Sequence, residues 1–536
     1  MDRFSTRRTF IKGSVAGFTG LILGCKSNGS AVQSETNSPV RLRKNIWKLT
    51  SESPDLIYFK SAILVMRQIG VDHPTLGNLG WAGQVKIHRE ACPHLNWYFF
   101  PWHRVYTSYF ENIADMFAKQ LRAHLRKEVP KEKSIFQQGV VVPKIDKELA
   151  DQLINTETDF ALPYWDWSFQ DTGPDVWITM PPILMDDNIL NPTLWKDYWP
   201  EPINRWATDE STMAEWGTKA MMNKILAIDS FAAFASAKAK EQKEETTGGE
   251  FEAQPHNNIH QWVGGAMSGM NSPLDPAFWL HHSNSDRIWE SWMMHHHRDP
   301  KIIEPSTDAA DWKNSQVWGF YDLQNKPAVH KIADTLTIDS LTFLEKKYTY
   351  DEYVIPPESD QKPAEGIRLV DTTSATITSD FVHATASKAA NVVTLNITDS
   401  GEKTSFVNVL KAYKNRARKL VLTIRNIPTP RKGEDISQVK FYIEFEKGAP
   451  QWFYIATYAF FAPHHPTQNI MFEISTLMSE IEETMKRSQV ELKDLGGLRF
   501  NLALFKSVQT KRRFEPISSL GQETLTAYDD LAFEVG

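Results

Sequence analysis

Residues 94–104 have the sequence His94-Leu95-Asn96-Trp97-Tyr98-Phe99-Phe100-Pro101-Trp102-His103-Arg104. After Pro101, apolar and aromatic residues recur at steps of three and four, at Trp102, Tyr106, Tyr109, Ile113, Met116 and Phe117. This spacing predicts the buried face of a helix. Proline is well tolerated at a first helical position, so we expect the helix to begin at Pro101. His103 then lies in its first turn, and His94 comes from the loop or turn before it.

Two further stretches also combine histidine with helical signals. In His256-Asn257-Asn258-Ile259-His260, the two histidines are four residues apart and therefore share one face of a helix. The third stretch is Asp275-Pro276-Ala277-Phe278-Trp279-Leu280-His281-His282-Ser283-Asn284-Ser285-Asp286. Aspartate before proline is a typical helix cap, so we expect His282 on a helix and Asp286 one turn later.

Three histidine stretches, each among aromatic residues, indicate a metal site. A lone His103 would more often be a core residue, and the pair His256 and His260 alone would fit zinc equally well. Di-iron bundles use Glu-x-x-His motifs, which this sequence lacks. Ligation by imidazole alone favours copper, which binds nitrogen most tightly among the divalent ions of its series.

These stretches resemble the copper signatures of the tyrosinase and polyphenol oxidase family. The copper A signature is matched by His94, Phe99, Trp102, His103, Arg104, Thr107 and Glu111, and the copper B signature by Asp275, Pro276, Phe278, Trp279, His282 and Asp286. Residues 81–88, 159–167 and 269–276 are also similar to the family. The resemblance covers roughly residues 45–300. It implies an α+β multidomain protein with a mainly α-helical dicopper domain, built round a helix bundle, at residues 45–335.

The resemblance implies two copper ions with six histidine ligands. His88, His94 and His103 would hold copper A, and His256, His260 and His282 would hold copper B. Some relatives place the first ligand further upstream, which leaves His73 as an alternative to His88.

Other family positions have expected roles beside the ligands. Cys92-Pro93-His94 resembles the pattern that forms a thioether between cysteine and histidine, although Cys92 could also be a plain buried thiol. Arg104, His281 and Asp286 are expected to support the ligands, and Arg104 with Asp286 could simply form a salt bridge.

The family resemblance implies an enzyme that oxidises phenols with O₂. It would hydroxylate monophenols at the ortho position, oxidise o-diphenols to o-quinones, or do both. Glu252 and Asn257 would hold a water that takes the proton of a monophenol, unless Glu252 is only a solvated loop carboxylate. Gln261 stands where some active relatives have arginine. The alternatives are a catechol or o-aminophenol oxidase without hydroxylase activity and a haemocyanin-like dioxygen carrier.

The N-terminal 30 residues have the features of an export signal. Thr6-Arg7-Arg8-Thr9-Phe10-Ile11-Lys12 precedes a short apolar stretch and resembles a twin-arginine signal. Cys25 follows a lipoprotein-like sequence, so we expect a periplasmic or extracellular protein with a lipid anchor at Cys25 as one option. Residues 31–44 are expected to form a flexible linker.

The C-terminal part has the composition of a β-sandwich. We expect a linker at residues 336–366 and a β-sandwich at 367–536, which resembles the domain that covers the active site in latent polyphenol oxidases. Strands are predicted at 420–424, 439–445, 452–461, 470–474 and 498–505. The polar segment 237–249 is expected to be an exposed loop.

Composition limits the classes of partner. The formal net charge of −7 and the absence of a basic run argue against nucleic acid, and the two cysteines exclude a disulfide scaffold. Small phenols and O₂ are the expected partners, and the oligomeric state stays open. His295, His296 and His297 are expected at a solvated helix end, and His464 and His465 at a loop tip.

Overall fold

The computed structural model describes residues 40–128, 134–169, 177–194, 205, 212–213 and 217–354 of the N-terminal part. In the C-terminal part it describes 377–378, 382–386, 392–397, 421–431, 436–445, 452–461, 465–475, 477, 481, 483, 486–487, 498–508, 513–517 and 531–535. The expected export signal with Cys25 and residues 355–366 of the expected second linker lie outside these ranges. Within them, no helix combines the length and the apolar character needed to cross a bilayer.

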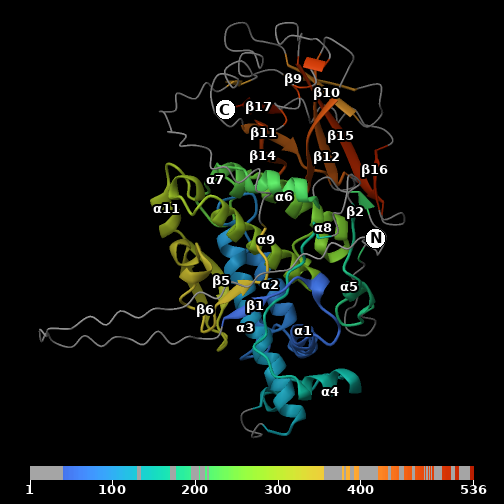
Figure 1. The fold of residues 1–536 in the computed structure, drawn as a ribbon, viewed down its shortest axis with the longest axis vertical. Coiled ribbons are helices and arrows are strands. Elements are labelled where there is room, and N and C mark those ends of the chain that lie inside the picture. The colour runs from blue at the N-terminus through green and yellow to red at the C-terminus, as the bar shows by residue number, and fades with distance from the viewer. Residues whose placement is uncertain are drawn as a thin grey trace, which may run out of the picture. The chain divides into compact units, whose positions relative to one another are not determined.

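The N-terminal part of the chain is built mainly from helices (Figure 1). The two longest are α3 (Phe99–Leu125) and α9 (Pro276–His295), and α3 packs against both α9 and α1 (Pro54–Met66). Phe110 of α3 stacks on Trp279 of α9 with ring centroids 3.5 Å apart. The other helices are α2 (Trp81–Ala91), α4 (Lys147–Asn155), α5 (Pro182–Asp186), α6 (Lys219–Leu226), α7 (Phe231–Ala235), α8 (Asn257–Val263), α10 (Pro300–Ile303) and α11 (Ala309–Asn314). The predicted helical domain is thereby confirmed.

The starts of the two long helices follow from capping chemistry. Asp275 caps α9, and its carboxylate accepts a hydrogen bond of 2.8 Å from the Ala277 amide, as predicted. By contrast, the expected start of α3 at Pro101 is wrong by two residues, because the helix begins at Phe99. Pro101 lies in the first turn, where amide groups have no partner within the helix, and proline is therefore tolerated there.

His256 and His260 lie at the junction of two kinds of helix. Residues Glu252–His256 form a π-helical turn that contains Pro255, and α8 follows directly. Proline lacks an amide hydrogen, so the regular ladder is interrupted and the turn widens. The two imidazoles still share a face, with ring centroids 4.6 Å apart.

A short sheet ties both ends of the helical domain together. Strand β1 (Arg41–Arg43) pairs in parallel with β7 (Tyr348–Tyr350), and these strands overlap the expected linkers at 31–44 and 336–366. The buried Arg43 guanidinium donates to Glu111 of α3 at 2.8 Å and lies 3.5 Å from the Asp286 carboxylate of α9. The N-terminal strand therefore links the two long helices.

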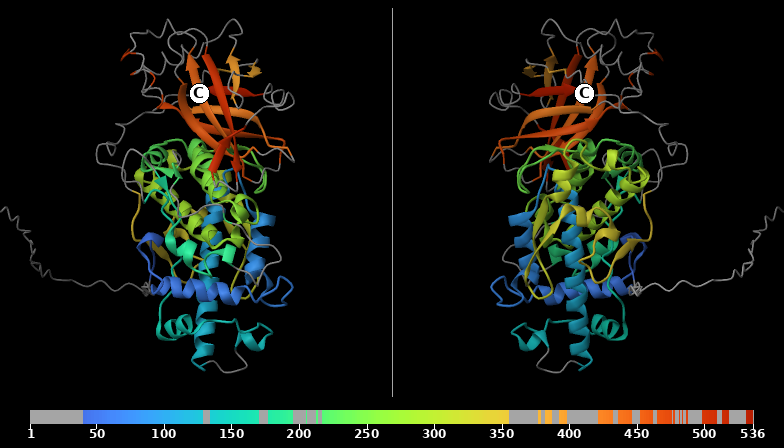
Figure 2. Two further views of the ribbon diagram at one scale, coloured as in Figure 1. Left: turned by 90° about the vertical axis from the view of Figure 1, so that its right-hand side faces the viewer. Right: turned by 90° about the vertical axis from the view of Figure 1, so that its left-hand side faces the viewer.

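The C-terminal part consists of two β-sheets, which confirms the predicted β domain (Figure 2). One sheet has the order β13-β12-β15-β10-β9 with β16 paired to β15, and the other has the order β4-β14-β11-β17-β8. Phe441 of the first sheet and Phe472 of the second have ring centroids 6.0 Å apart. All five predicted strands are present. Their bounds are β11 (Val421–Pro428), β12 (Gln438–Phe445), β13 (Trp452–Ala459), β14 (Thr467–Glu473) and β15 (Leu498–Val508).

The remaining strands are short. They are β2 (Trp177–Ile178), β3 (Thr212–Met213), β4 (Thr247–Gly248), β5 (Gln316–Tyr321), β6 (Pro327–Lys331), β8 (Ile377–Thr378), β9 (Val382–Ala386), β10 (Val392–Ile397), β16 (Arg513–Pro516) and β17 (Ala532–Val535). Strand β4 belongs to the helical part of the sequence but pairs in parallel with β14 of the β domain.

The prediction of an exposed loop at residues 237–249 is wrong for part of the segment. Gln242 is only 3% exposed, and its side-chain amide donates to the main-chain carbonyl of Ala91 at 2.5 Å. Its own carbonyl accepts a hydrogen bond from Asn96. The polar composition of the segment predicted exposure to solvent, but a side-chain amide can be buried when main-chain groups form hydrogen bonds with it.

Candidate metal centre

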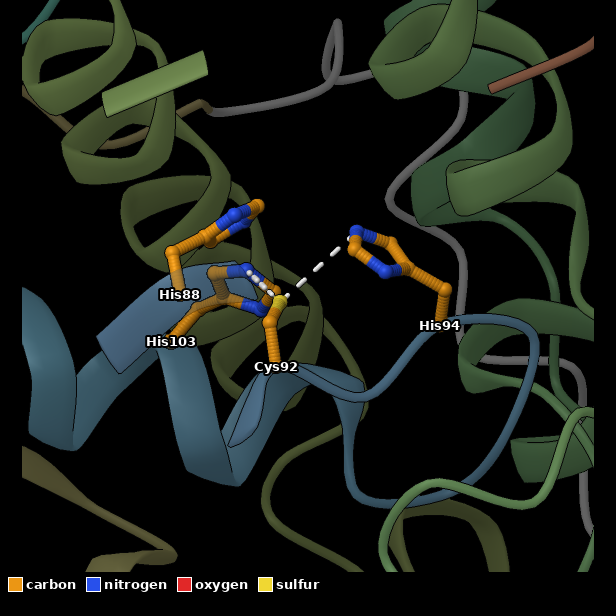
Figure 3. A group of neighbouring side chains, drawn as sticks. All are labelled: His88, Cys92, His94 and His103. Atoms are coloured by element: carbon orange, nitrogen blue, oxygen red, sulfur yellow. Dashed lines mark hydrogen bonds between the residues drawn. The ribbon is translucent and has the colours of Figure 1, made fainter. Parts of the chain in front are cut away.

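A first group of ligand-type side chains comes from the N-terminal histidine stretch (Figure 3). His88 lies near the end of α2, Cys92 caps that helix, His94 lies in the following loop, and His103 lies in the second turn of α3. One nitrogen or sulfur atom from each lies within 4.8 Å of those of the other three, and all four residues are buried. The structure thus brings His88 into this group.

His73, the alternative to His88, has another role. Its imidazole bonds to the Gln138 carbonyl at 3.1 Å and accepts a hydrogen bond from the Leu76 amide at 3.2 Å. These contacts hold a turn together, and His73 does not belong to the group.

Main-chain carbonyls orient two rings of the first group. The Nδ1 atom of His88 lies 2.9 Å from the Met270 carbonyl, and that of His103 lies 2.8 Å from the Phe99 carbonyl. A carbonyl can only accept, so each Nδ1 donates and leaves Nε2 as a lone-pair donor. Histidines that bind metals are usually fixed in this way.

Cys92 lies between two of these histidines. Its sulfur is 3.7 Å from Nε2 of His94 and 3.2 Å from Nε2 of His103 (Figure 3). Burial raises the pKa of the Cys92 thiol, and the charge of Glu252 adds to the shift. Without a covalent bond to His94, Cys92 is therefore a neutral thiol at physiological pH.

A second group comes from α8, α9 and the π-helical turn. It contains His256, His260, His281 and His282, all buried, with one ring nitrogen of each within 4.8 Å of those of the others. The Nδ1 atom of His260 bonds to the Met267 carbonyl at 2.7 Å, and that of His256 bonds to the Asn257 side-chain oxygen at 2.9 Å. His260 and His282 face each other, with their Nε2 atoms 3.4 Å apart.

The two groups lie side by side. The rings of His103 and His282 stack with centroids 4.1 Å apart and planes within 6°. His94 and His256 also approach across the boundary, with ring centroids 6.1 Å apart. Two ions held by these groups would be neighbours, as a dinuclear centre requires.

The donor set fits copper. Burial lowers the pKa of His88 to about 4 and that of His260 to about 3, so both rings are neutral and able to bind metal at physiological pH. The Nε2 atoms of His88 and His256 are buried and have no hydrogen-bond partner. Buried nitrogen atoms normally have partners, and a copper ion would supply the missing ones.

Charged side chains connect the helices that carry the two groups. Arg104 of α3 donates to the carboxylates of Asp286 at 2.5 Å and Glu290 at 2.9 Å, both on α9. Burial opposes ionisation of Asp286, but Arg104 and Arg43 outweigh it and lower its pKa. The salt bridge between Arg104 and Asp286 is present, and it lies one turn from His282 and next to His103.

Glu252 is buried, which excludes its interpretation as a solvated carboxylate. Its two oxygens accept hydrogen bonds from the Leu95 amide at 2.7 Å and the Ser236 hydroxyl at 3.1 Å. Burial raises the pKa of Glu252 to about 8, with a smaller contribution from Glu245. Asn257 is buried as well and touches His256 through its side-chain oxygen.

One residue of the β domain reaches this centre, and no sequence signal marked it. Phe461 follows β13, and its ring centroid lies 4.9 Å from that of His94 and 4.3 Å from that of His260. Gln261 holds the adjacent carbonyl of Phe460 with a hydrogen bond of 2.6 Å. Only the packing of the two domains brings these residues together.

The remaining histidines lie elsewhere. His295 ends α9, and His297 is exposed just beyond it, as expected for a solvated helix end. His296 differs from that prediction, because it is half-buried and packs against Trp292 with ring centroids 5.2 Å apart. His465 is exposed before β14, and His464 lies outside the described residues. Of the described residues in these two sets, none belongs to the two groups.

Comparison with known proteins identifies similar sequences and a similar fold. Residues 66–206 and 184–295 match the family model of the common central domain of tyrosinase. Tyrosinase HcTyr1 of Hahella sp. (strain CCB-MM4) is 22% identical over 343 residues, which cover 57% of this chain and 63% of the relative. The latent, chloroplastic polyphenol oxidase of Prunus armeniaca is 23% identical over 360 residues, which cover 59% and 49%. The chain spans about three fifths of the length of the first curated relatives it matches.

A solved structure extends the likeness of fold to both domains. A latent aurone synthase, described as a polyphenol oxidase, aligns over 92% of each chain with a TM-score of 0.52 and 19% identity. At this identity the alignment concerns the fold alone.

Proposed function

Because this chain belongs to the tyrosinase and polyphenol oxidase family, which uses a pair of copper ions, we propose that it oxidises phenols with O₂ at the two histidine groups. The observation that carries the proposal is the contact between two buried groups, each with at least three imidazoles, through His103 and His282. Copper bound there would supply electron transfer between the phenol and O₂.

We propose the six histidines as ligands in two sets of three. His88, His94 and His103 would hold one ion, and His256, His260 and His282 would hold the other. The carbonyl partners of His88, His103 and His260 support this assignment, because each directs Nε2 into its group. Burial keeps the rings neutral and excludes bulk water from the centre.

Glu252 and Asn257 are proposed to hold a water that accepts the proton of a monophenol. The pKa of about 8 makes the Glu252 carboxylate a stronger base than an exposed glutamate. Asn257 lies beside His256 and could bind the same water. With this base the enzyme would hydroxylate monophenols; without it the activity would be limited to catechols or o-aminophenols.

The proposed site has two further features, a crosslink between Cys92 and His94 and a covering side chain, Phe461. The short distance between Cys92 and His94 supports a thioether that would fix the ring of His94. The contacts of Phe461 with His94 and His260 support a covering role for the β domain, because this ring lies where a phenol ring would need to approach.

Export is proposed from the sequence of residues 1–30 alone. The paired Arg7 and Arg8 and the following apolar stretch would direct the chain to the periplasm or the exterior, with lipidation of Cys25 as one option. Detection of a lipid on the N-terminal peptide by mass spectrometry would test the anchor.

The decisive experiment is oxygen uptake by the copper-loaded full chain with 4-tert-butylcatechol and with p-coumaric acid. We expect oxidation of the catechol, and of the monophenol if Glu252 provides the base. Glu252→Gln should preserve an acceptor for the Leu95 amide while lowering monophenol turnover by about 10²-fold or more and diphenol turnover far less. Equal losses would contradict the base role, and reversible O₂ binding without turnover would favour a carrier.

A further inference from the structure

His281 is a buried imidazole whose contacts are incomplete. It precedes His282 on α9, and its side chain has no solvent exposure. Neither of its ring nitrogens has a hydrogen-bond partner. Nearly all buried polar atoms in proteins have a partner, and imidazole offers one donor and one acceptor. An unpaired ring of this kind therefore points to a ligand.

The position of the ring indicates which ligand. Its centroid lies 4.6 Å from that of His260, 4.9 Å from that of His282 and 5.0 Å from that of His256. One of its nitrogens lies within 4.8 Å of the ligand atoms of these three histidines. Trp167 packs against the ring, with centroids 5.0 Å apart. His281 thus adds a fourth nitrogen to the second group.

The first group offers no such residue. Its fourth member is Cys92, a thiol beside His94 and His103. In the second group the fourth member is an imidazole, which binds copper in both oxidation states. Consecutive residues on a helix point about 100° apart, so His281 and His282 approach the group from different sides.

We infer that His281 is a fourth copper-binding residue of the second group, which holds the ion with His256 and His260 while the site is filled. The group is closed to solvent, so an ion that enters it loses its water ligands and needs protein nitrogen atoms in their place. His281 supplies such an atom close to those of His256, His260 and His282. The inference rests on the proposed copper centre.

Copper uptake by the metal-free full chain tests this role without any substrate. Copper(I) would be supplied from a competing chelator, and the rate of uptake, the copper content and the electron paramagnetic resonance of the oxidised protein would be measured. His281→Phe keeps an aromatic ring against Trp167 and removes both nitrogens, and His281→Gln keeps a polar group. His297→Gln, at the exposed helix end, is the matched control.

We expect both His281 variants to fill the second group at least about tenfold more slowly or more weakly, as for other residues that support metal ligands. Incomplete filling would leave an isolated copper ion with a visible resonance signal, whereas the control should match the parent protein. Unchanged uptake and copper content in His281→Phe would overturn the inference. A parent protein that takes up no copper would instead contradict the proposed function.

Folding defects can be separated from loss of binding. Each variant's copper-induced rise in melting temperature is compared with its own metal-free value, because a ligand that binds only the folded state raises this temperature. A smaller rise in both His281 variants, with a normal metal-free melting temperature in at least one, supports the inference. An equal rise in either His281 variant and the parent overturns it.

Discussion

The two histidine groups differ in how much of the molecule is needed to build them. The first uses residues 88–103, a single short stretch that runs from α2 to α3. The second joins α8 to α9, and α8 also bonds to the β domain through Asn258, which donates to the Thr457 carbonyl and accepts from Gln438. The first group is thus local in sequence, while the second depends on packing between distant segments.

This difference suggests that the β domain acts on the second group more directly than on the first. Gln261, next to His260, donates a hydrogen bond to the Phe460 carbonyl. Asn258, two positions after His256, donates to the Thr457 carbonyl. The first group meets the β domain through the contact of His94 with Phe461. Substitutions in the two groups can therefore separate local from long-range assembly.

The largest effect is expected from removal of one ligand in each group. His88→Ala should abolish phenol oxidation and leave about one copper per chain, because only two imidazoles would remain in the first group. His260→Ala should also abolish phenol oxidation and weaken copper binding in the second group, although His256, His281 and His282 remain there. Metal analysis and electron paramagnetic resonance would identify the remaining ion. Loss of both ions in His260→Ala, with one retained in His88→Ala, would show that the second group must form first.

The second largest effect is expected at Asp286, whose buried salt bridges connect the helices that carry the two groups. Asp286→Asn removes the negative charge that Arg43 and Arg104 both contact, and breaking such a buried pair costs about 3–5 kcal/mol of folding free energy. Denaturant unfolding of the full chain would measure the loss.

The matched control for Asp286 is an exposed pair. Asp308→Asn disrupts the contact of Asp308 with Lys238 on the surface and should leave stability unchanged. Equal effects of the two substitutions would contradict a special role for the charges between α3 and α9.

A smaller effect is expected from opening the contact between the β domain and the centre. If a phenol must displace the Phe461 ring to reach the centre, exposing that ring costs about 1.5–3 kcal/mol. Phe461→Ala removes this cost and should therefore raise kcat/KM for 4-tert-butylcatechol by roughly 10–100-fold. Copper content should not change. Phe169→Ala, at a half-exposed surface ring, is the control, and an unchanged kcat/KM in Phe461→Ala would contradict the proposed covering role.

The smallest effect is expected from Cys92, and it should be confined to the first group. A thioether would make the peptides of Cys92 and His94 migrate as one species lighter by two hydrogens, which mass spectrometry of a digest detects. Cys92→Ser should abolish this species and weaken copper binding in the first group by about tenfold. A parent protein with a free thiol would exclude the crosslink.

The sequence predicted those features that depend on neighbours along the chain. The spacing of His256 and His260, the cap formed by Asp275 and the strand predicted at 439–445 each depend on local geometry, and all three appear in the structure. The start of α3 was placed two residues late, because proline is compatible with any position of the first turn. Gln242 was expected to be exposed because it lies in the polar segment 237–249, and the composition of that segment does not reveal that the Ala91 carbonyl accepts a hydrogen bond from its side-chain amide.

By itself, the sequence determined the helical and β-rich parts of the chain and the histidines available to copper, because periodicity and capping act over a few residues. Only the tertiary structure decided that His103 stacks on His282, that His281 joins the second group and that Phe461 approaches His94. These contacts join segments tens to hundreds of residues apart, and they depend on the summed packing of whole elements that no local pattern records.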